Sequence, residues 1–346
     1  MLIIRSVEAS DLDSIYELSL LMNFINLPQD QEALNEKIKS SIESFKNPSP
    51  VLWKNHYIFV IEDLEEKKVI GVSMIHAQHG TEEEPHFYLQ VGREKKYSET
   101  LRSGFIHGTL KLGIESDGPT EIGGLVLMPE YRQSPLKIGK VLSYVRFLYL
   151  GLHPENFKKE VHAELLPPFD SEGNSPLWEA IGRRFTNMNY HEADLLSRTN
   201  KEFILTFYPR EKIYETLLPM EARSAIGKVG KETKPVKKML EAIGFKYTKQ
   251  VDPFDGGPHF RAKLKEIKVI KKMFTGKIVF DTGFNPSTAT PTILTLPCPK
   301  GKFLAARVMA NVMDNSQIII SSKDLPGYKI PEDFKSSGIF LDLKEK

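Results

Sequence analysis

The most informative stretch of the chain is residues 125–140, which read Leu125-Val126-Leu127-Met128-Pro129-Glu130-Tyr131-Arg132-Gln133-Ser134-Pro135-Leu136-Lys137-Ile138-Gly139-Lys140. An apolar strand end is followed by a basic loop and then by the start of an amphipathic helix. Free amide groups at a helix start point outward and form a site for an anion such as a pyrophosphate. Arg132, Lys137 and Lys140 add positive charge to this loop. The same pattern is also typical of a surface loop with solvated lysines in front of a core helix.

The segments on either side of the loop predict a βαβ unit. Residues 123–128 are an extended apolar stretch that ends at Pro129, and residues 161–165 read as a second strand. Between them, the spacing predicts a helix over 138–152, with six apolar residues on one face: Ile138, Val141, Leu142, Val145, Leu148 and Leu152. A strand, a helix and a strand in this order predict a right-handed crossover and a locally parallel strand pair.

Upstream of this unit the pattern predicts a β-hairpin. Residues 57–61 and 69–75 are apolar runs, and the charged segment 63–68 between them reads as the hairpin loop. Because hairpin strands accompany the βαβ unit, we expect a mixed sheet with flanking helices and an α+β fold class. The chain before the hairpin predicts three further elements: a strand over 2–7 and helices over 12–21 and 31–45.

Downstream of residue 198 a second block of structure is expected. Residues 203–207 read as a strand, helical segments follow as far as residue 245, and short β-rich runs begin near residue 280. We therefore predict a first domain over 1–198, a second half-domain over 199–285 and a β-rich segment over 286–346.

The composition argues against several classes of protein. Lys and Arg number 47 and Asp and Glu 45, and this balance of +2 lacks the basic excess typical of nucleic-acid binding. Cys298 is the only cysteine, which excludes an intrachain disulfide and a CxxC metal site. No apolar run reaches the roughly 18 residues of a membrane span, and no signal-peptide pattern is present. We expect a soluble cytoplasmic protein, able to form homo-oligomers, with small-molecule substrates and without metal, nucleic-acid or membrane partners.

The order of helix, hairpin, strand, basic loop and helix resembles the acyl-CoA N-acyltransferase (GNAT) fold, in which such a loop holds the CoA pyrophosphate. Residues 173–185, Gly-Asn-Ser-Pro-Leu-Trp-Glu-Ala-Ile-Gly-Arg-Arg-Phe, are similar to the G-x-S-P-F-W-x-x-L-G-x-R-F stretch of bacterial arginine N-succinyltransferases. Residues 254–258 match the F-D-G-G-P motif of that family, and residues 4–11 and 188–195 also fit it. The resemblance extends from about residue 2 to about residue 265, in the family's order and spacing.

The resemblance implies a tandem GNAT-like architecture in which residues 1–198 bind the acyl-CoA. Members of the family transfer succinyl from succinyl-CoA to the α-amine of arginine in arginine catabolism, and succinyl-CoA is a co-substrate, so no permanently bound cofactor is expected. The resemblance assigns the CoA contacts to six residues: Leu125, Leu127, Arg132, Lys137, Gly139 and Lys140. Contacts at Leu125 would be made by the backbone, and the family's first loop glycine falls at Lys137.

Three family motifs are altered in this chain. The family's Gly-rich T-G-x-G-x-T-S-L-P is replaced by residues 21–28, where only Leu27-Pro28 is kept. The family's A-E-M-R-G is residues 163–167, which keep the acid as Glu164 and lose the arginine. The family's G-x-V-H-P, whose histidine is the assigned proton donor, is residues 227–231, with Gly230 at the histidine position.

Acyl transfer needs a group that moves protons, and two residues are candidates for catalysis. His259 follows the F-D-G-G-P motif and could replace the missing proton donor, although it also reads as a solvated loop histidine. Glu164 could act as a base or hold a cationic substrate, and it could equally be paired with a basic residue. Asp255 and Gly256 are candidates for arginine binding, whereas a D-G-G sequence is also typical of an Asx turn.

The sequence therefore predicts an enzyme, an arginine N-succinyltransferase that uses succinyl-CoA. Two alternatives stay open. One is an acyl-CoA N-acyltransferase with a different amine or acyl donor, and the other is a catalytically weak paralogue that binds acyl-CoA.

Overall fold

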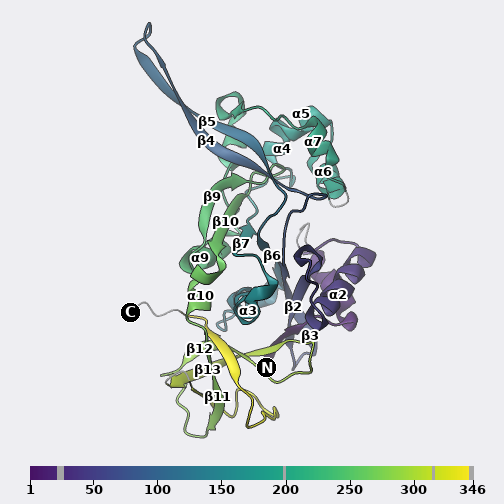
Figure 1. Cartoon of the computed structure of the whole chain (residues 1–346), viewed down its shortest axis with the longest axis vertical. Helices are drawn as coiled ribbons and strands as arrows, with labels where there is room; N and C mark the ends of the chain where they lie inside the picture. Colours follow the sequence, from purple (N-terminus) through teal and green to yellow (C-terminus); the bar gives the residue numbers. More distant parts are fainter. Residues whose placement is uncertain (22–26, 198–199, 314–315, 343–346) are drawn as a thin grey trace. The chain divides into compact units, whose positions relative to one another are not determined.

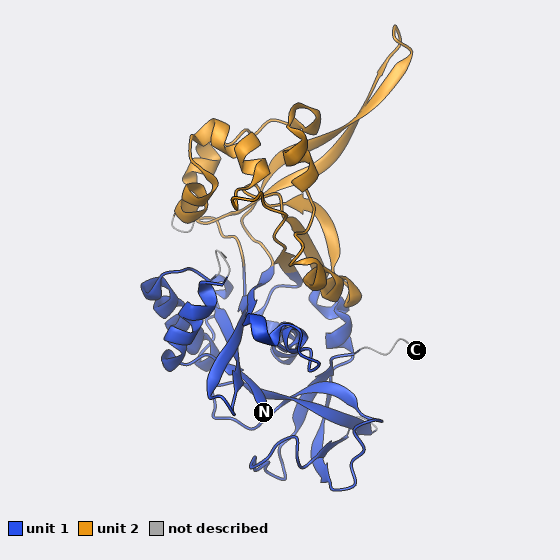
Figure 2. Cartoon of the chain, turned by 180° about the vertical axis from the view of Figure 1, so that it is seen from behind, with its two compact units in different colours: residues 1–78, 120–161, 263–346 blue, residues 79–119, 162–262 orange. Residues whose placement is uncertain are grey.

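The computed structural model describes residues 1–21, 27–197, 200–313 and 316–342. The chain forms two compact units, coloured separately in Figure 2: residues 1–78, 120–161 and 263–346 form unit 1, and residues 79–119 and 162–262 form unit 2. Each unit is therefore assembled from segments that are distant in the sequence. The predicted domain borders at 198 and 285 do not coincide with the borders of these units, because the strands of both units pair across long stretches of chain.

Unit 1 contains an antiparallel sheet whose strands neighbour one another in the order β1-β2-β3-β6. The strands are β1 (Leu2–Ser6), β2 (His56–Asp63), β3 (Lys68–His76) and β6 (Thr120–Leu127). Strands β2 and β3 are buried along most of their length, as their continuous apolar runs require. The predicted hairpin over 57–75 is confirmed.

Three helices accompany this sheet in unit 1 (Figure 1): α1 (Leu12–Ser19), α2 (Gln31–Lys46) and α3 (Ile138–Leu152). Helix α2 begins where the Asp30 side chain accepts a hydrogen bond from the Ala33 amide, as an N-cap should. Helix α3 is almost entirely buried, and Ser73 of β3 donates to its Leu142 carbonyl at 2.9 Å. The predicted helices over 31–45 and 138–152 are confirmed.

The C-terminal strands of unit 1 form a closed five-stranded ring. Neighbouring strands pair in the order β12-β15-β11-β14-β13, and a further pairing of β12 with β13 closes the ring. The ring encloses its own apolar cluster, which includes Leu294, Val308 and Ile320. Strand β13 also pairs with β1, so the barrel continues the N-terminal sheet. The barrel strands are β11 (Phe274–Asp281), β12 (Thr290–Thr295), β13 (Leu304–Met313), β14 (Gln317–Ser321) and β15 (Ser336–Phe340).

Unit 2 is built on a second antiparallel sheet in the order β10-β9-β4-β5-β8. Its strands are β4 (His86–Ser98), β5 (Ser103–Glu115), β8 (Ile213–Tyr214), β9 (Lys246–Val251) and β10 (Pro258–Lys263). Strand β7 (Glu160–Glu164) begins in unit 1 and ends in unit 2. The long β4–β5 hairpin extends away from the helices of its unit (Figure 1). No element was expected there, because its outer half is exposed and lacks an alternating apolar pattern.

The two motifs that carry the family resemblance pack against each other in the core of unit 2. Trp178 stacks on Phe254 with a centroid distance of 4.9 Å. Ser175 caps helix α4 (Pro176–Ala180) by accepting from the Trp178 amide, and it donates to the Phe254 carbonyl at 2.8 Å. The other helices of unit 2 are α5 (Gly182–Thr186), α6 (Tyr190–Ser197), α7 (Glu202–Phe207), α8 (Met220–Ala225) and α9 (Lys234–Ala242).

The prediction of a strand over 203–207 is wrong, since these residues belong to helix α7. Phe203 and Ile204 are buried in the unit 2 core, whereas Phe207 is exposed, and so short an apolar run does not separate a strand from a helical turn. The remaining elements are helix α10 (Lys268–Lys271) and the 3-10 helices η1 (Ala9–Asp11), η2 (Leu52–Lys54), η3 (Pro129–Tyr131), η4 (Pro154–Asn156), η5 (Glu215–Leu217) and η6 (Leu264–Glu266).

The α+β class with mixed strand pairing and flanking helices is confirmed. Within the described part of the chain, no helix is both long and apolar enough to cross a membrane. Residues 22–26, which hold most of the altered Gly-rich motif, lie outside the described residues.

Candidate active site

The basic loop between β6 and α3 lies on the surface of unit 1. Arg132 turns back toward the strand and donates from Nε to the Leu127 carbonyl at 3.0 Å. Lys137, the residue before α3, has a φ of 54°. This left-handed conformation favours glycine, which is a physical reason for the glycine that the resembling family has at this position. Gly139 lies in the first turn of α3, and the packing there leaves space for a side chain. A Cβ added at this position would meet only Leu127 Cδ2 at 3.9 Å.

Two lysines at the start of α3 hold an anionic group. Lys137 Nζ lies 3.1 Å from one carboxylate oxygen of Asp342, and Lys140 Nζ lies 3.0 Å from the other. Partial burial opposes ionisation of Asp342, but the hydrogen bonds from Lys140 and Lys137 leave its pKa below the ordinary value. The start of α3 can therefore bind an anion, and in this structure the anion is the carboxylate of Asp342, which follows the last strand of the barrel.

Strand β6 has a β-bulge in front of this loop. The pairing with β3 shifts register so that Gly124 and Leu125 both lie opposite Ser73. Gly124 has a φ of 55°, which a residue with a side chain adopts only with strain. A bulge leaves the backbone groups of its extra residue out of the ladder. The Leu125 backbone is thus withdrawn from pairing with β3, whereas the Leu127 side chain is buried.

Arg146 of α3 brings a buried positive charge close to the bulge. It is 2% exposed, and it donates to the Gly123 carbonyl at 3.1 Å and to the Ser143 carbonyl and hydroxyl. No carboxylate accompanies these contacts, and burial alone lowers its pKa to about 9. The arrangement fastens α3 to β6 beside the bulge.

Unit 2 contains a cluster of three histidines and one glutamate at the ends of three strands. His162 and Glu164 lie two residues apart on β7 and therefore share a face, while His86 begins β4 and His259 lies on β10. Glu164 Oε1 lies 3.0 Å from His162 Nε2, 3.6 Å from His86 Nδ1 and 3.7 Å from His259 Nε2. The three imidazoles are buried, whereas the Glu164 side chain is 29% exposed. Glu164 is therefore the member of the cluster that a substrate could reach.

Hydrogen bonds set the proton positions in this cluster. Arg261 donates from Nε to His162 Nδ1 at 3.2 Å, so a neutral His162 carries its proton on Nε2 and donates to Glu164. Burial lowers the pKa of His259 to about 3, although Glu164 opposes the shift. Burial and the neighbouring His79 lower the pKa of His86 as well. His86 and His259 are thus neutral imidazoles near neutral pH.

The turn of the F-D-G-G-P motif uses its carboxylates internally. Asp255 is buried, and its Oδ1 accepts from the Gly257 amide at 2.6 Å, while Gly256 has a φ of 82°. Asp252 accepts from the amides of Phe254 and Asp255. Burial and the proximity of Asp252 raise the pKa of Asp255. Asp255 therefore forms an Asx turn, as one of the two interpretations of this motif proposed.

Gly230 lies in a tight backbone contact. Its amide donates to the Leu166 carbonyl at 2.9 Å. A Cβ at this position would lie 2.8 Å from the Pro167 carbonyl oxygen, a backbone atom that cannot move aside easily. The loop therefore has no space for the histidine that the resemblance places here.

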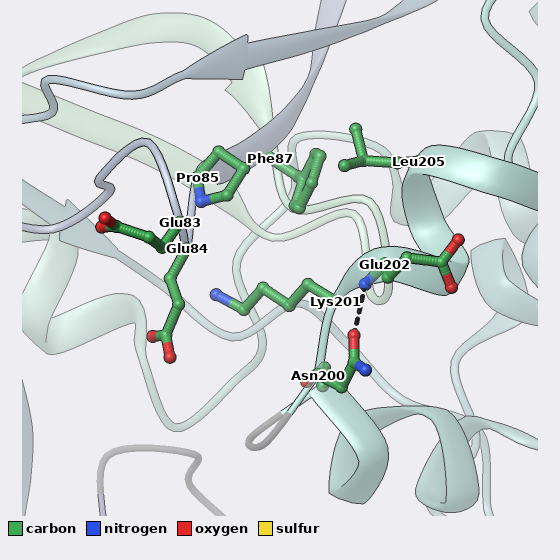
Figure 3. Close-up of a pocket in the computed structure, with 9 residues that line it drawn as sticks. Glu83, Glu84, Pro85, Phe87, Asn200, Lys201, Glu202 and Leu205 are labelled. Atoms are coloured by element: carbon green, nitrogen blue, oxygen red, sulfur yellow. Dashed lines mark hydrogen bonds between the residues drawn. The ribbon is translucent and has the colours of Figure 1, made fainter.

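A pocket of about 390 Å³ lies elsewhere in unit 2 (Figure 3). It is lined by Glu83, Glu84, Pro85, Phe87, Ser197, Asn200, Lys201, Glu202 and Leu205. Among these residues, the Asn200 side chain accepts a hydrogen bond from the Glu202 amide at 2.8 Å (Figure 3). None of the predicted site residues contributes to this pocket.

Comparison with known proteins identifies the family. The family model described as "Arginine N-succinyltransferase beta subunit" matches residues 2–269. The chain belongs to the arginine N-succinyltransferase family.

Relatives within this family cover most of the chain. The arginine N-succinyltransferase of Yersinia enterocolitica is 35% identical over 284 residues, which is 81% of each chain. The Escherichia coli enzyme of the same name is 32% identical over 275 residues, 79% of each chain. The solved arginine/ornithine succinyltransferase subunit AI from Pseudomonas aeruginosa superposes with a TM-score of 0.84 at 25% identity and covers 99% of both chains. The C-terminal barrel, which lies beyond residue 269, is thus part of the shared fold.

Membership of the arginine N-succinyltransferase family makes the chain an acyltransferase with small-molecule substrates and a CoA thioester as co-substrate. The structure brings Glu164 and His259 together, as catalysis by both residues requires. It places His259 on a buried strand and not in a solvated loop. The assignment of the predicted catalytic, CoA-binding and arginine-binding residues to these roles stays a prediction.

Four residues of interest were not predicted from the sequence: His86, His162, Gly124 and Arg146. The pair His162-x-Glu164 in a predicted strand signals two polar side chains on one face. The Gly123-Gly124 pair inside a strand is typical of a bulge. No local signal marks His86, whose cluster partners come from distant strands, or Arg146, whose contact with Gly123 depends on the packing of α3 against β6.

Proposed function

We propose that the chain is an arginine N-succinyltransferase that moves succinyl from succinyl-CoA to the α-amine of arginine. The family match over residues 2–269 carries this proposal. The loop before α3 and the Glu164 cluster supply the two kinds of group that the reaction needs: cations for the CoA phosphates and a base for the amine. A cytoplasmic location fits a chain with a single cysteine.

Succinyl-CoA binding begins with its pyrophosphate at the first turn of α3. The free amides of this turn and the lysines Lys137 and Lys140 attract phosphate oxygens, and Asp342 gives up its place to the more highly charged group. The pantetheine arm follows β6, where the bulge leaves Leu125 backbone groups available. Arg132 keeps the loop in place through its bond to Leu127.

Proton transfer is assigned to Glu164. The α-amine of arginine must lose a proton before its nitrogen attacks the thioester carbonyl, and a partly exposed carboxylate can take that proton. His162 donates to Glu164 and orients it. Neutral His259 stands beside Glu164 as a positioning residue, and it does not supply an imidazolium because its pKa is about 3. The C–S bond of the thioester then breaks, the departing CoA thiolate takes the proton held by Glu164, and the new amide nitrogen releases its remaining extra proton to water.

A steady-state assay of thiol release from succinyl-CoA with arginine tests the proposal. We expect turnover by the wild type and a loss of about 10²-fold or more in kcat for Glu164→Gln, since a positioned base contributes about 10²–10⁴-fold. Glu232→Gln, an exposed carboxylate of the same unit, is the matched control and should leave turnover unchanged. Full activity of Glu164→Gln would contradict the role of Glu164 as base.

The glycine at position 230 supports a second candidate function of a different class. In this alternative the chain is an acyl-CoA-binding protein with weak turnover. The family's proton donor is absent there, and the loop has no space for it. A panel of amines and acyl-CoA thioesters in the same assay separates the candidates. Tight CoA binding without thiol release from any pair would support the binding protein, and release with another amine would support a different acceptor.

A further inference from the structure

The histidine–glutamate cluster of unit 2 has the composition and spacing of a metal site. His86, His162, Glu164 and His259 each offer a ligand atom, and these atoms lie within 4.8 Å of one another. In a tetrahedral zinc site with bonds of about 2.0–2.2 Å, neighbouring ligand atoms are about 3.3–3.6 Å apart. The distance from Glu164 Oε1 to His259 Nε2, 3.7 Å, is close to this range.

Two of these histidines have buried nitrogens without hydrogen-bond partners. Both ring nitrogens of His259 and Nε2 of His86 are buried and unpartnered. A buried polar group without a partner costs about 1–3 kcal/mol. A neutral imidazole has one N–H and one lone pair, so each of these two histidines can offer one buried nitrogen lone pair, which a metal cation accepts.

The surrounding hydrogen bonds assign the ligands. His86 Nδ1 lies 2.8 Å from His79 Nε2. If His86 carries its proton on Nδ1 and donates it to His79, the lone pair of the unpartnered His86 Nε2 is available to a metal ion. A metal-bound histidine typically donates its other ring N–H to such an outer partner. His162 differs, because Arg261 already donates to its Nδ1 and its Nε2 proton points at Glu164. His162 therefore orients Glu164 and is not itself a ligand.

We propose that His86, His259 and Glu164 form a binding site for a divalent transition-metal cation, best matched by zinc. Two imidazoles and one carboxylate, with a water as fourth ligand, are a set typical of zinc, whereas magnesium and calcium prefer oxygen donors. This proposal departs from the prediction made from the sequence, which places no metal in the chain. Bound metal would join β4, β7 and β10 and would occupy the Glu164 lone pairs, so it would compete with proton transfer from the substrate amine.

Metal titration of the full-length protein tests the site without reference to turnover. The protein is dialysed against a chelator, incubated with zinc chloride, and analysed for metal content by mass spectrometry and for affinity by calorimetry. We expect one zinc per chain, with affinity lowered at least 100-fold in His86→Ala and His259→Ala. His162→Ala should weaken binding by about 10–100-fold, as removal of an outer partner does. His191→Ala, an exposed histidine of the same unit, should bind like the wild type.

Cobalt(II) gives a readout that needs no variant to fold. Wild-type protein with one equivalent of cobalt should develop the visible absorption of a four- or five-coordinate nitrogen–oxygen site, and zinc should abolish it. Absence of bound metal in the wild type, or binding that is unchanged in both His86→Ala and His259→Ala, would overturn the proposal. These outcomes are independent of the succinyltransferase assay, since a chain that binds zinc stoichiometrically but never releases thiol would support the site and contradict the function.

Discussion

Gly230 shows how a single residue can exclude the side chain that a family uses at its position. In this chain the backbone at 230 has approached the carbonyl of Pro167, and its amide is bound by the carbonyl of Leu166. The contact is possible because glycine has no Cβ. Any acid–base group for acyl transfer must therefore come from elsewhere, and Glu164 is the partly exposed titratable residue of the nearby histidine cluster.

Introducing the family's histidine at position 230 should therefore not increase activity. We expect Gly230→His to lower the free energy of unfolding by about 1–3 kcal/mol, as overpacking does, and to leave thiol release no higher than in the wild type. Gly283→Ala is the control, because its Cβ would meet only Asp281 Oδ1 at 3.6 Å and its stability should hardly change. Denaturant unfolding and the succinyl-CoA assay measure both effects. Increased turnover in Gly230→His at unchanged stability would show that the loop opens to accept the side chain.

Among the secondary-structure elements, β6 and its bulge are the part of the chain on which the proposed CoA site depends. It needs a residue with positive φ at Gly124, and it withdraws Leu125 from the ladder with β3. The backbone strain at Gly124 and the proposed CoA contact at Leu125 therefore depend on the same bulge.

Substitution of Gly124 separates these two contributions. Gly124→Ala should cost about 1–2 kcal/mol of stability because of its φ of 55°, and the added Cβ would lie 2.9 Å from Met74 Sδ. We expect a higher KM for succinyl-CoA as the bulge relaxes. Gly124→Asn should lose less, since asparagine tolerates left-handed backbone better. An unchanged KM in Gly124→Ala, despite lower stability, would remove the bulge from the CoA site.

The turn between β9 and β10 should make unit 2 sensitive to pH. Burial and the nearby Glu164 and Asp194 raise the pKa of Asp252 to about 7, although hydrogen bonds from the amides of Asp255 and Phe254 oppose the shift. Since the folded pKa exceeds the unfolded value of 3.8, the folded protein binds more protons between these values, and this carboxyl destabilises the fold as pH rises from about 4 to about 7.

Asp252→Asn keeps an oxygen to accept the amides of Phe254 and Asp255 but cannot ionise. We expect the variant to be more stable than the wild type by about 2–4 kcal/mol above pH 7 and nearly equal to it at pH 4. Thermal unfolding of both proteins across this pH range measures the difference. A difference that is constant with pH would show that Asp252 does not titrate in this window.

At the scale of the whole molecule, closure of the C-terminal barrel returns the end of the described chain to α3. Strand β15 pairs with β11 and β12, and Asp342 follows it and binds the two lysines at the helix start. A segment outside the family match thereby contributes a carboxylate to the proposed pyrophosphate site.

Asp342 should therefore weaken the binding of acyl-CoA. We expect Asp342→Asn to lower the KM for succinyl-CoA several-fold with little change in kcat, because the lysines lose a competing anion. Asp333→Asn, an exposed carboxylate of the same unit, should have no effect. Lys137→Ala with Lys140→Ala should raise the KM. A KM that rises in Asp342→Asn would mean that the carboxylate positions the lysines for CoA and does not compete with it.

The sequence by itself determined the features that depend on neighbouring residues. Periodicity predicted the β2–β3 hairpin and helices α2 and α3, and linear motifs around Trp178 and Phe254 indicated the family. In the structure these two motifs pack on each other in the core of unit 2. The prediction of a strand over 203–207, where the structure has helix α7, is wrong because a run of a few apolar residues fits a strand and a helical turn equally well.

Which side chains meet depends on the tertiary structure. His86, Glu164 and His259 come from three strands whose alignment depends on pairings between distant segments, and a shift of one residue in any of them would turn its side chain to the opposite face. The closed barrel, the Asp342 contact and the lack of space at Gly230 have the same origin. Local pattern specifies an element and its buried face, whereas register and long-range packing specify the neighbours on which the chemistry depends.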